Sequence, residues 1–167
     1  EAARAEGIHT ALDTSGLTRI TPDVERLLDR TDLVLLDLKH IDPERHRELT
    51  GRSNELVLAF ARHLAERGTP AWIRHVIVPG FTDDPDDARR TARFVSTLPN
   101  VERVELLPYH EYGRHKWEAL GTPYPLEGTS PPSEDLVRKL REVFAAEGLP
   151  VAQAGRGRRA TGCTPPA

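Results

Sequence analysis

The 167-residue sequence contains no methionine, one cysteine and only three lysines among its 23 basic residues. The single cysteine, Cys163, excludes an internal disulfide framework and is typical of a reducing compartment, so we predict a cytoplasmic protein. Because methionine is absent, we expect residue 1 to lie inside a longer chain. The scarcity of lysine draws attention to Lys39 and Lys116, where a compact ammonium replaces the planar guanidinium that this sequence otherwise prefers.

The sequence also lacks long apolar runs and a strong charge bias. Apolar stretches such as residues 33–36 are far shorter than the about 20 residues that cross a bilayer, so no membrane span is predicted. A formal net charge of −3 gives no electrostatic reason to expect nucleic acid as a partner. The length suits one domain over residues 1–153, and residues 154–167, rich in Gly, Arg and Pro, are predicted to be a disordered tail.

Apolar, β-branched runs alternate with stretches of helical period. Strands are predicted over residues 8–12, 32–38, 71–78 and 101–107, and helices over residues 54–67, 84–98 and 133–147, with short helices capped by Thr21 and Asp42. A long, aromatic-rich loop over residues 108–132 precedes the last helix. Strand–helix alternation repeated four times predicts an α/β fold with parallel strands, either a doubly wound sheet or a (β/α) barrel.

Charged side chains stand at the carboxyl ends of the predicted strands. Asp13 ends the first strand, and Asp37 and Lys39 share one face at the end of the second. Arg74 lies in the third strand, and His110 follows the fourth. Because ligands gather at the carboxyl ends of parallel strands, we predict that these five side chains converge on one cavity.

Taken one at a time, these signals also have purely structural explanations. Asp37 with Lys39 could form an ion pair at a barrel rim. Residues 13–16 could form an ordinary turn in which Asp13 and Thr14 act as caps. The spacing of His110 and His115 fits no common metal pair on a helix face. A functional interpretation therefore depends on the motifs taken together.

Five short motifs occur in a fixed order along the chain. They are LDTSG at residues 12–16, LDLK at 36–39, WIRHVIVPG at 72–80, LLPYH at 106–110 and GRHKW at 113–117. With these motifs the chain resembles the glycyl-radical-enzyme activases of the radical S-adenosylmethionine (SAM) family, in particular those that activate pyruvate formate-lyase. The resemblance covers roughly residues 10–150 and leaves out the tail.

The resemblance implies a fold and a reaction. The fold is a partial (β/α)6 barrel with parallel strands, of which this chain would supply strands three to six, the C-terminal portion. In the reaction, a reduced [4Fe–4S] cluster cleaves SAM to methionine and a 5′-deoxyadenosyl radical, which abstracts a hydrogen from a glycine of the partner enzyme. The implied partners are pyruvate formate-lyase or a related glycyl radical enzyme, and a flavodoxin or ferredoxin-type reductant. A monomer is the simplest expectation.

The resemblance also implies which residues bind the cofactor. The residues expected to contact SAM are Asp13, Asp37, Leu38, Lys39, Arg74 and His110. A monovalent cation beside the SAM carboxylate would be held by Asp13, Thr14 and Asp37. Carboxylate and hydroxyl oxygens are the hard ligands that such a cation takes.

One part of the family's machinery has no counterpart in the sequence. The family binds its cluster through three cysteines in a CxxxCxxC motif, whereas this sequence has Cys163 alone. We therefore expect the cluster ligands to lie upstream of residue 1. We expect this chain by itself to bind no cluster, to contain no catalytic residue and to be inactive.

Three other interpretations remain open on the sequence alone. The chain could belong to an activase of a different glycyl radical enzyme. It could be a (β/α)-barrel aldolase or hydrolase in which Lys39 forms a Schiff base. It could also be a binding module that recognises a partner through the aromatic loop at residues 109–117.

Overall fold

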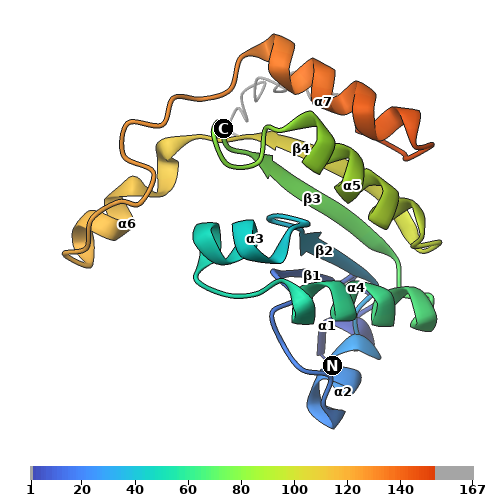
Figure 1. The fold of residues 1–167 in the computed structure, drawn as a ribbon. Coiled ribbons are helices and arrows are strands. Elements are labelled where there is room, and N and C mark those ends of the chain that lie inside the picture. The colour runs from blue at the N-terminus through green and yellow to red at the C-terminus, as the bar shows by residue number, and fades with distance from the viewer. Residues whose placement is uncertain (1, 153–167) are drawn as a thin grey trace, which may run out of the picture.

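The computed structural model describes residues 2–152, so the predicted tail at residues 154–167 lies outside the described part of the chain. Four parallel strands form one sheet in the order β1-β2-β3-β4 (Figure 1). The strands are β1 (Ala11–Thr14), β2 (Leu33–Asp37), β3 (Ala71–Ile77) and β4 (Val101–Pro108). The predicted parallel α/β architecture is confirmed.

Helices connect the strands and cover the sheet. They are α1 (Ala2–Ala5), α2 (Pro22–Leu28), α3 (Pro43–Thr50), α4 (Glu55–Arg67), α5 (Pro85–Ser96), the 3-10 helix η1 (Glu111–Gly113), α6 (Arg114–Ala119) and α7 (Glu134–Ala146). Among the described residues, no helix combines the length and apolar character needed to cross a membrane.

The helix starts follow directly from the sequence. The side chains of Thr21, Asp42, Asp84 and Ser133 accept hydrogen bonds from the first exposed N–H groups of α2, α3, α5 and α7. Proline occupies the first turn of α2, α3 and α5, where its missing N–H costs nothing. These caps fix where each helix begins, and therefore how long the loop after each strand is.

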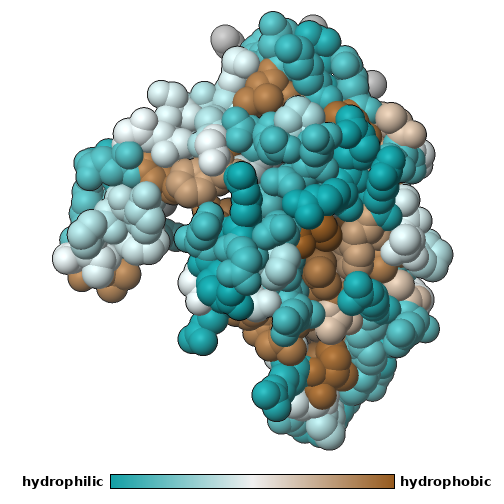
Figure 2. Space-filling view, viewed as in Figure 1, coloured by the Kyte–Doolittle hydropathy of each residue, from teal (hydrophilic) through white to brown (hydrophobic). Residues whose placement is uncertain are grey.

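The hydrophobic core lies on one face of the sheet. Along β3 the side chains alternate, with Ile73 and Ile77 buried and Trp72, Arg74 and Val76 half-buried on the opposite face. The buried side chains of β2, β3 and β4 pack against the apolar faces of α4, α5 and α7. In the space-filling view, apolar residues gather between helices whose outer surfaces are mostly hydrophilic (Figure 2). The other face of the sheet is left free to carry charged groups.

Two sequence predictions differ from the structure. Ile8 lies outside β1 and is exposed, because the turn after α1 brings its N–H to the carbonyl of Ala3 and the strand begins only at Ala11. The predicted loop at residues 108–132 contains η1 and α6, which stand clear of the sheet (Figure 1). The sequence signal for α6 is weak because the helix has six residues and buries none of them.

Candidate functional site

Four charged side chains meet at the carboxyl edge of the sheet, on the face that the core leaves free. Strand pairing sets them there, because Asp13 aligns with Leu35 and Asp37 aligns with Arg74 in neighbouring strands. Lys39 lies two residues beyond Asp37 and therefore returns to the same face. Asp13, Asp37, Lys39 and Arg74 therefore lie together as predicted, whereas their lining of a common cavity stays a prediction.

Arg74 is the centre of this group. Its Nε donates to Asp37 Oδ1 at 2.8 Å, and its Nη1 donates to Asp13 Oδ2 at 2.8 Å. On the far side of Asp37, Lys39 Nζ donates to Oδ2 at 2.7 Å. The side chains of Arg74 and Asp37 are 18% and 19% exposed, whereas that of Asp13 is 61% exposed. The group therefore runs from a half-buried interior to open solvent.

The charges in the group balance, with two carboxylates facing two cations. Burial alone would lower the pKa of Arg74, but its hydrogen bonds to Asp13 and Asp37 and their negative charges outweigh burial and raise that pKa. Arg74 is therefore a permanent cation. The group presents several donors and acceptors at one place, and the exposed end of the group at Asp13 contributes little to folding.

Leu38 and Thr14 take different positions from the charged group. The Leu38 side chain is buried in the core on the opposite face, its N–H donates to Arg74 O, and its carbonyl accepts from His75. The Thr14 hydroxyl accepts the N–H of Gly16 at 3.0 Å and so orders the turn after β1. Their predicted roles at a SAM site and a cation site stay predictions.

His110 follows β4 and is exposed. Its Nδ1 accepts the N–H of Tyr112 at 3.4 Å, and the two rings stack with centroids 4.2 Å apart. Within the described residues, no contact joins His110 to Asp13, Asp37, Lys39 or Arg74. The structure brings four of the five predicted side chains together and leaves His110 apart from them, at the start of the segment that leads to α6.

Sequence reasoning missed the buried polar residues beneath the site. His40, Asn54 and His75 are all buried, and each bonds to the chain just after β2. The alternation along β3 places His75 on the buried face with Ile73 and Ile77, but nothing in its spacing indicates its partner. A polar residue at an apolar position of a strand was the available signal, since such residues need a buried partner.

Burial keeps His75 neutral, which makes the fold sensitive to acid. Burial lowers the His75 pKa below its usual 6.5, although a carbonyl contact from Leu38 works in the other direction. As the pH falls through about 6.5, unfolded chains take up a proton that folded His75 does not, so the free energy of unfolding falls with pH. Above that pH the contribution to stability is fully present.

We therefore expect His75→Asn, which keeps a donor in the position of Nδ1 but does not titrate, to lose less stability on acidification. Urea unfolding at pH 8 and pH 5 tests this. Between pH 8 and pH 5, the free energy of unfolding should fall more for the unsubstituted protein than for the variant. Parallel curves would show that His75 does not contribute to acid sensitivity.

The charged group combines an ammonium, a guanidinium and two carboxylates at one place. No group of three or more His, Cys, Asp or Glu side chains comes together in the described residues as a metal site would need. Arg74 stands between Asp13 and Asp37, so a monovalent cation would have to share these carboxylates with it. The ammonium, the guanidinium and the carboxylates together can donate hydrogen bonds to a polar ligand and accept hydrogen bonds from it.

No protein-family model matches. The chain is 51% identical over 150 residues to a pyruvate formate-lyase-activating enzyme of Streptococcus mutans, covering 87% of this chain and 57% of the relative. It is 46% identical over 148 residues to pyruvate formate-lyase 1-activating enzyme of Escherichia coli K12, covering 88% of this chain and 60% of the relative. The chain thus spans somewhat more than half the length of these relatives.

Solved structures agree on the fold. A domain of a pyruvate-formate lyase-activating enzyme from Bacteroides vulgatus superposes with a TM-score of 0.76 at 27% identity, covering 92% of this chain and 86% of that domain. A radical SAM methyltransferase from Sphaerobacter thermophilus superposes with a TM-score of 0.62 at 20% identity, covering 88% of this chain and 41% of that structure. The four parallel strands therefore share the fold of part of these structures, which agrees with the predicted partial barrel.

Proposed function

We propose that this chain, which is related in sequence to the pyruvate formate-lyase-activating enzymes over most of its length, is part of a radical SAM enzyme that introduces a glycyl radical into pyruvate formate-lyase. The observation that carries the proposal is the high identity to relatives of that name, shared across nearly all the described residues. This identity favours pyruvate formate-lyase as the partner over other glycyl radical enzymes, and it disfavours the Schiff-base interpretation of Lys39.

SAM and a [4Fe–4S] cluster are the proposed cofactors, and together they supply hydrogen-atom abstraction. The charged group at the carboxyl edge is the proposed SAM site. Lys39 is free to donate to hydroxyl or carboxylate oxygens, since its only hydrogen bond in the described structure goes to Asp37. Arg74 offers a permanent positive charge to the SAM carboxylate.

The two aspartates are proposed to complete the site from the other side. Asp37 orients Lys39 and Arg74 and can accept from ribose hydroxyls, while the more exposed Asp13 faces the solvent-accessible end. Asp13, Thr14 and Asp37 remain the proposed ligands of a monovalent cation. Leu38 is proposed to shape the site from its backbone, and His110, next to the end of β4, to contact the same ligand.

The remaining functional assignments are also proposals. This sequence contains one cysteine, so cluster binding needs thiolates that these 167 residues do not provide. A flavodoxin or ferredoxin-type protein is the proposed electron donor, and the protein is proposed to act as a cytoplasmic monomer. Neither nucleic acid nor membrane is a proposed partner, in keeping with a net charge of −3.

An anaerobic activation assay tests the proposal. The complete protein that carries this chain, loaded with its cluster, is incubated with SAM, a one-electron reductant and pyruvate formate-lyase. We expect an electron paramagnetic resonance signal of a glycyl radical on pyruvate formate-lyase, with methionine and 5′-deoxyadenosine released in matching amounts. Radical formation only on a different glycyl radical enzyme would replace the proposed partner, and failure to bind SAM would overturn the assignment altogether.

A further inference from the structure

The five residues after β2, at positions 38–42, include Lys39. Buried polar side chains form several hydrogen bonds with the backbone of this segment. Most of this segment has no strand or helix hydrogen bonds, so its conformation depends on side chains from elsewhere. Three buried polar residues, His40, Asn54 and His75, are only 2–4% exposed and all bond within this segment. Burial of polar groups is costly unless they are paired, so this concentration requires an explanation.

Two of these residues hold backbone carbonyls of the segment. His75 Nδ1 lies 2.8 Å from Leu38 O, and because a carbonyl can only accept, the ring must carry its proton on Nδ1. Asn54 Nδ2 donates to Ile41 O at 2.7 Å and to His40 O at 3.1 Å. Asn54 stands at the start of α4 without capping that helix by its side chain, so its amide serves the segment instead.

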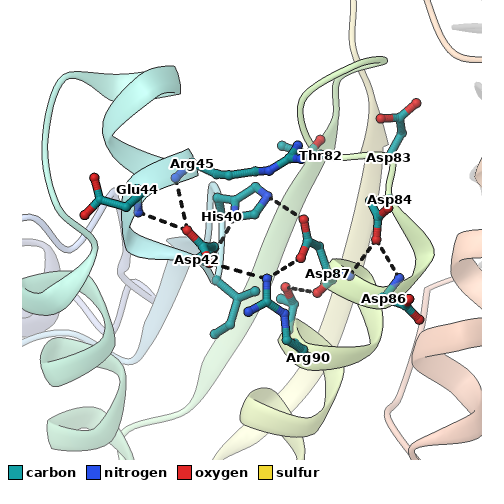
Figure 3. A network of polar contacts seen from close by, with 12 residues as sticks. His40, Asp42, Glu44, Arg45, Thr82, Asp83, Asp84, Asp86, Asp87 and Arg90 are labelled. Atoms are coloured by element: carbon teal, nitrogen blue, oxygen red, sulfur yellow. Dashed lines mark hydrogen bonds and ion pairs between the residues drawn. The ribbon is translucent and has the colours of Figure 1, made fainter.

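The third residue ties the segment to α5. His40 Nδ1 accepts the N–H of Asp42 at 3.0 Å, which leaves Nε2 to carry the proton. His40 Nε2 lies 3.2 Å from Asp87 Oδ2 in the first turn of α5, and Asp87 in turn pairs with Arg90 (Figure 3). Burial lowers the pKa of His40, so the ring stays neutral beside the Asp87 carboxylate.

Together these contacts leave the segment little freedom. If residues 38–42 moved away, the amide of Asn54 and the ring N–H of His75 would lose their partners in a buried environment, and the buried His40 ring would leave its place beside Asp87. Lys39 lies in the middle of this segment, and Asp37 directly precedes it. The backbone beneath the proposed SAM-binding side chains is therefore fixed before any ligand arrives, which reduces the entropy lost on binding.

We propose that Asn54, His75 and His40 are positioning residues for SAM. They hold residues 38–42 in the conformation that places Lys39 and Asp37 for binding, without touching the ligand themselves. This inference rests on the proposed SAM site. It adds to that site residues that do not contact SAM, which lie on the helix-covered side of the sheet and in the adjoining loop. Three buried side chains that stabilise the fold would thus also lower the entropy that the protein loses when it binds SAM.

A matched pair of substitutions separates positioning from general stability. Asn54→Ala removes the donor that holds His40 and Ile41. Asn100→Ala removes a similar donor, 2.6 Å from Thr69 O, at the opposite, amino edge of the sheet. Both variants are made in the complete, cluster-loaded protein. Thermal unfolding gives the stability of each, calorimetric titration with SAM gives the Kd, and hydrogen exchange reports the amides of Leu38 and Asp42.

We expect both variants to lose stability, but only Asn54→Ala to raise the Kd for SAM, by about three- to tenfold, corresponding to one net hydrogen bond. Only Asn54→Ala should speed exchange at Asp42. Equal Kd values for Asn54→Ala and Asn100→Ala would overturn the positioning role. A second pair of variants tests the proposal if Asn54→Ala folds poorly. His75→Asn, which retains a donor near Leu38, should bind SAM more tightly than His75→Leu. Equal affinities of these two variants for SAM would count against the proposal.

Lys39→Ala distinguishes failure of this inference from failure of the proposed site. If Lys39→Ala weakens SAM binding while Asn54→Ala behaves like Asn100→Ala, the SAM site stands and the positioning role is wrong. If Lys39→Ala leaves the Kd unchanged, the proposed site itself is wrong, and the positioning role falls with it. Loss of affinity in both Lys39→Ala and Asn54→Ala, with Asn100→Ala unchanged, supports the proposal.

Discussion

Replacement of Gly16 by alanine is expected to destabilise the protein by about 2–5 kcal/mol. Gly16 is buried with φ of +66°, a conformation that costs other residues about 1–2 kcal/mol. A Cβ at this position would also lie 2.7 Å from Leu36 Cδ1 and 3.1 Å from Phe60 Cδ1. Both neighbours belong to the densely packed core, so overpacking adds about 1–3 kcal/mol. Urea unfolding at pH 7 measures the loss.

Gly51→Ala provides the matched control for this substitution. Gly51 ends α3 with φ of +75°, but a Cβ there would meet no atom within 4 Å. Its replacement should therefore cost only the backbone term, about 1–2 kcal/mol. The difference between the two variants isolates the packing term at Gly16. Equal losses would mean that Leu36 and Phe60 move aside freely, contrary to the packing described for the core.

Asp37→Ala is expected to raise the Kd for SAM by about five- to 150-fold, equivalent to about 1–3 kcal/mol. Asp37 accepts hydrogen bonds from both Lys39 and Arg74, so its loss releases two cations at once. The half-buried Arg74 guanidinium would then face only Asp13, and Lys39 would lose the one partner that fixes its ammonium. Calorimetric titration of the complete, cluster-loaded protein with SAM checks the expectation.

Asp32→Ala serves as the control for Asp37→Ala. Asp32 lies at the amino edge of the sheet, where its carboxylate accepts from the N–H and hydroxyl of Thr10. Its removal should lower stability without changing the affinity for SAM. If Asp37→Ala affects affinity no more than Asp32→Ala does, the four-residue charged group is a structural ion network and SAM binds elsewhere.

Much of the fold was predictable because its signals are local. The alternation of apolar strands with amphipathic helices predicted four parallel strands, and cap residues such as Asp42 and Asp84 marked helix starts. The first strand was placed three residues too early at its start, because Ile8 looks like a strand residue but is exposed in a turn. Helix α6 was missed because it buries no residue and so has no apolar period.

The sequence alone determined which residues stand at the strand ends, because side chains alternate with a fixed period of two and motif order identifies the family resemblance. Only the tertiary structure decided which of them touch. Arg74 bonds to Asp37 and Asp13, which precede it by 37 and 61 positions, and Asn54 bonds to carbonyls 13 and 14 positions away. Such partners depend on strand register and on the path of a loop, which arise from packing of the whole domain and have no local period to read.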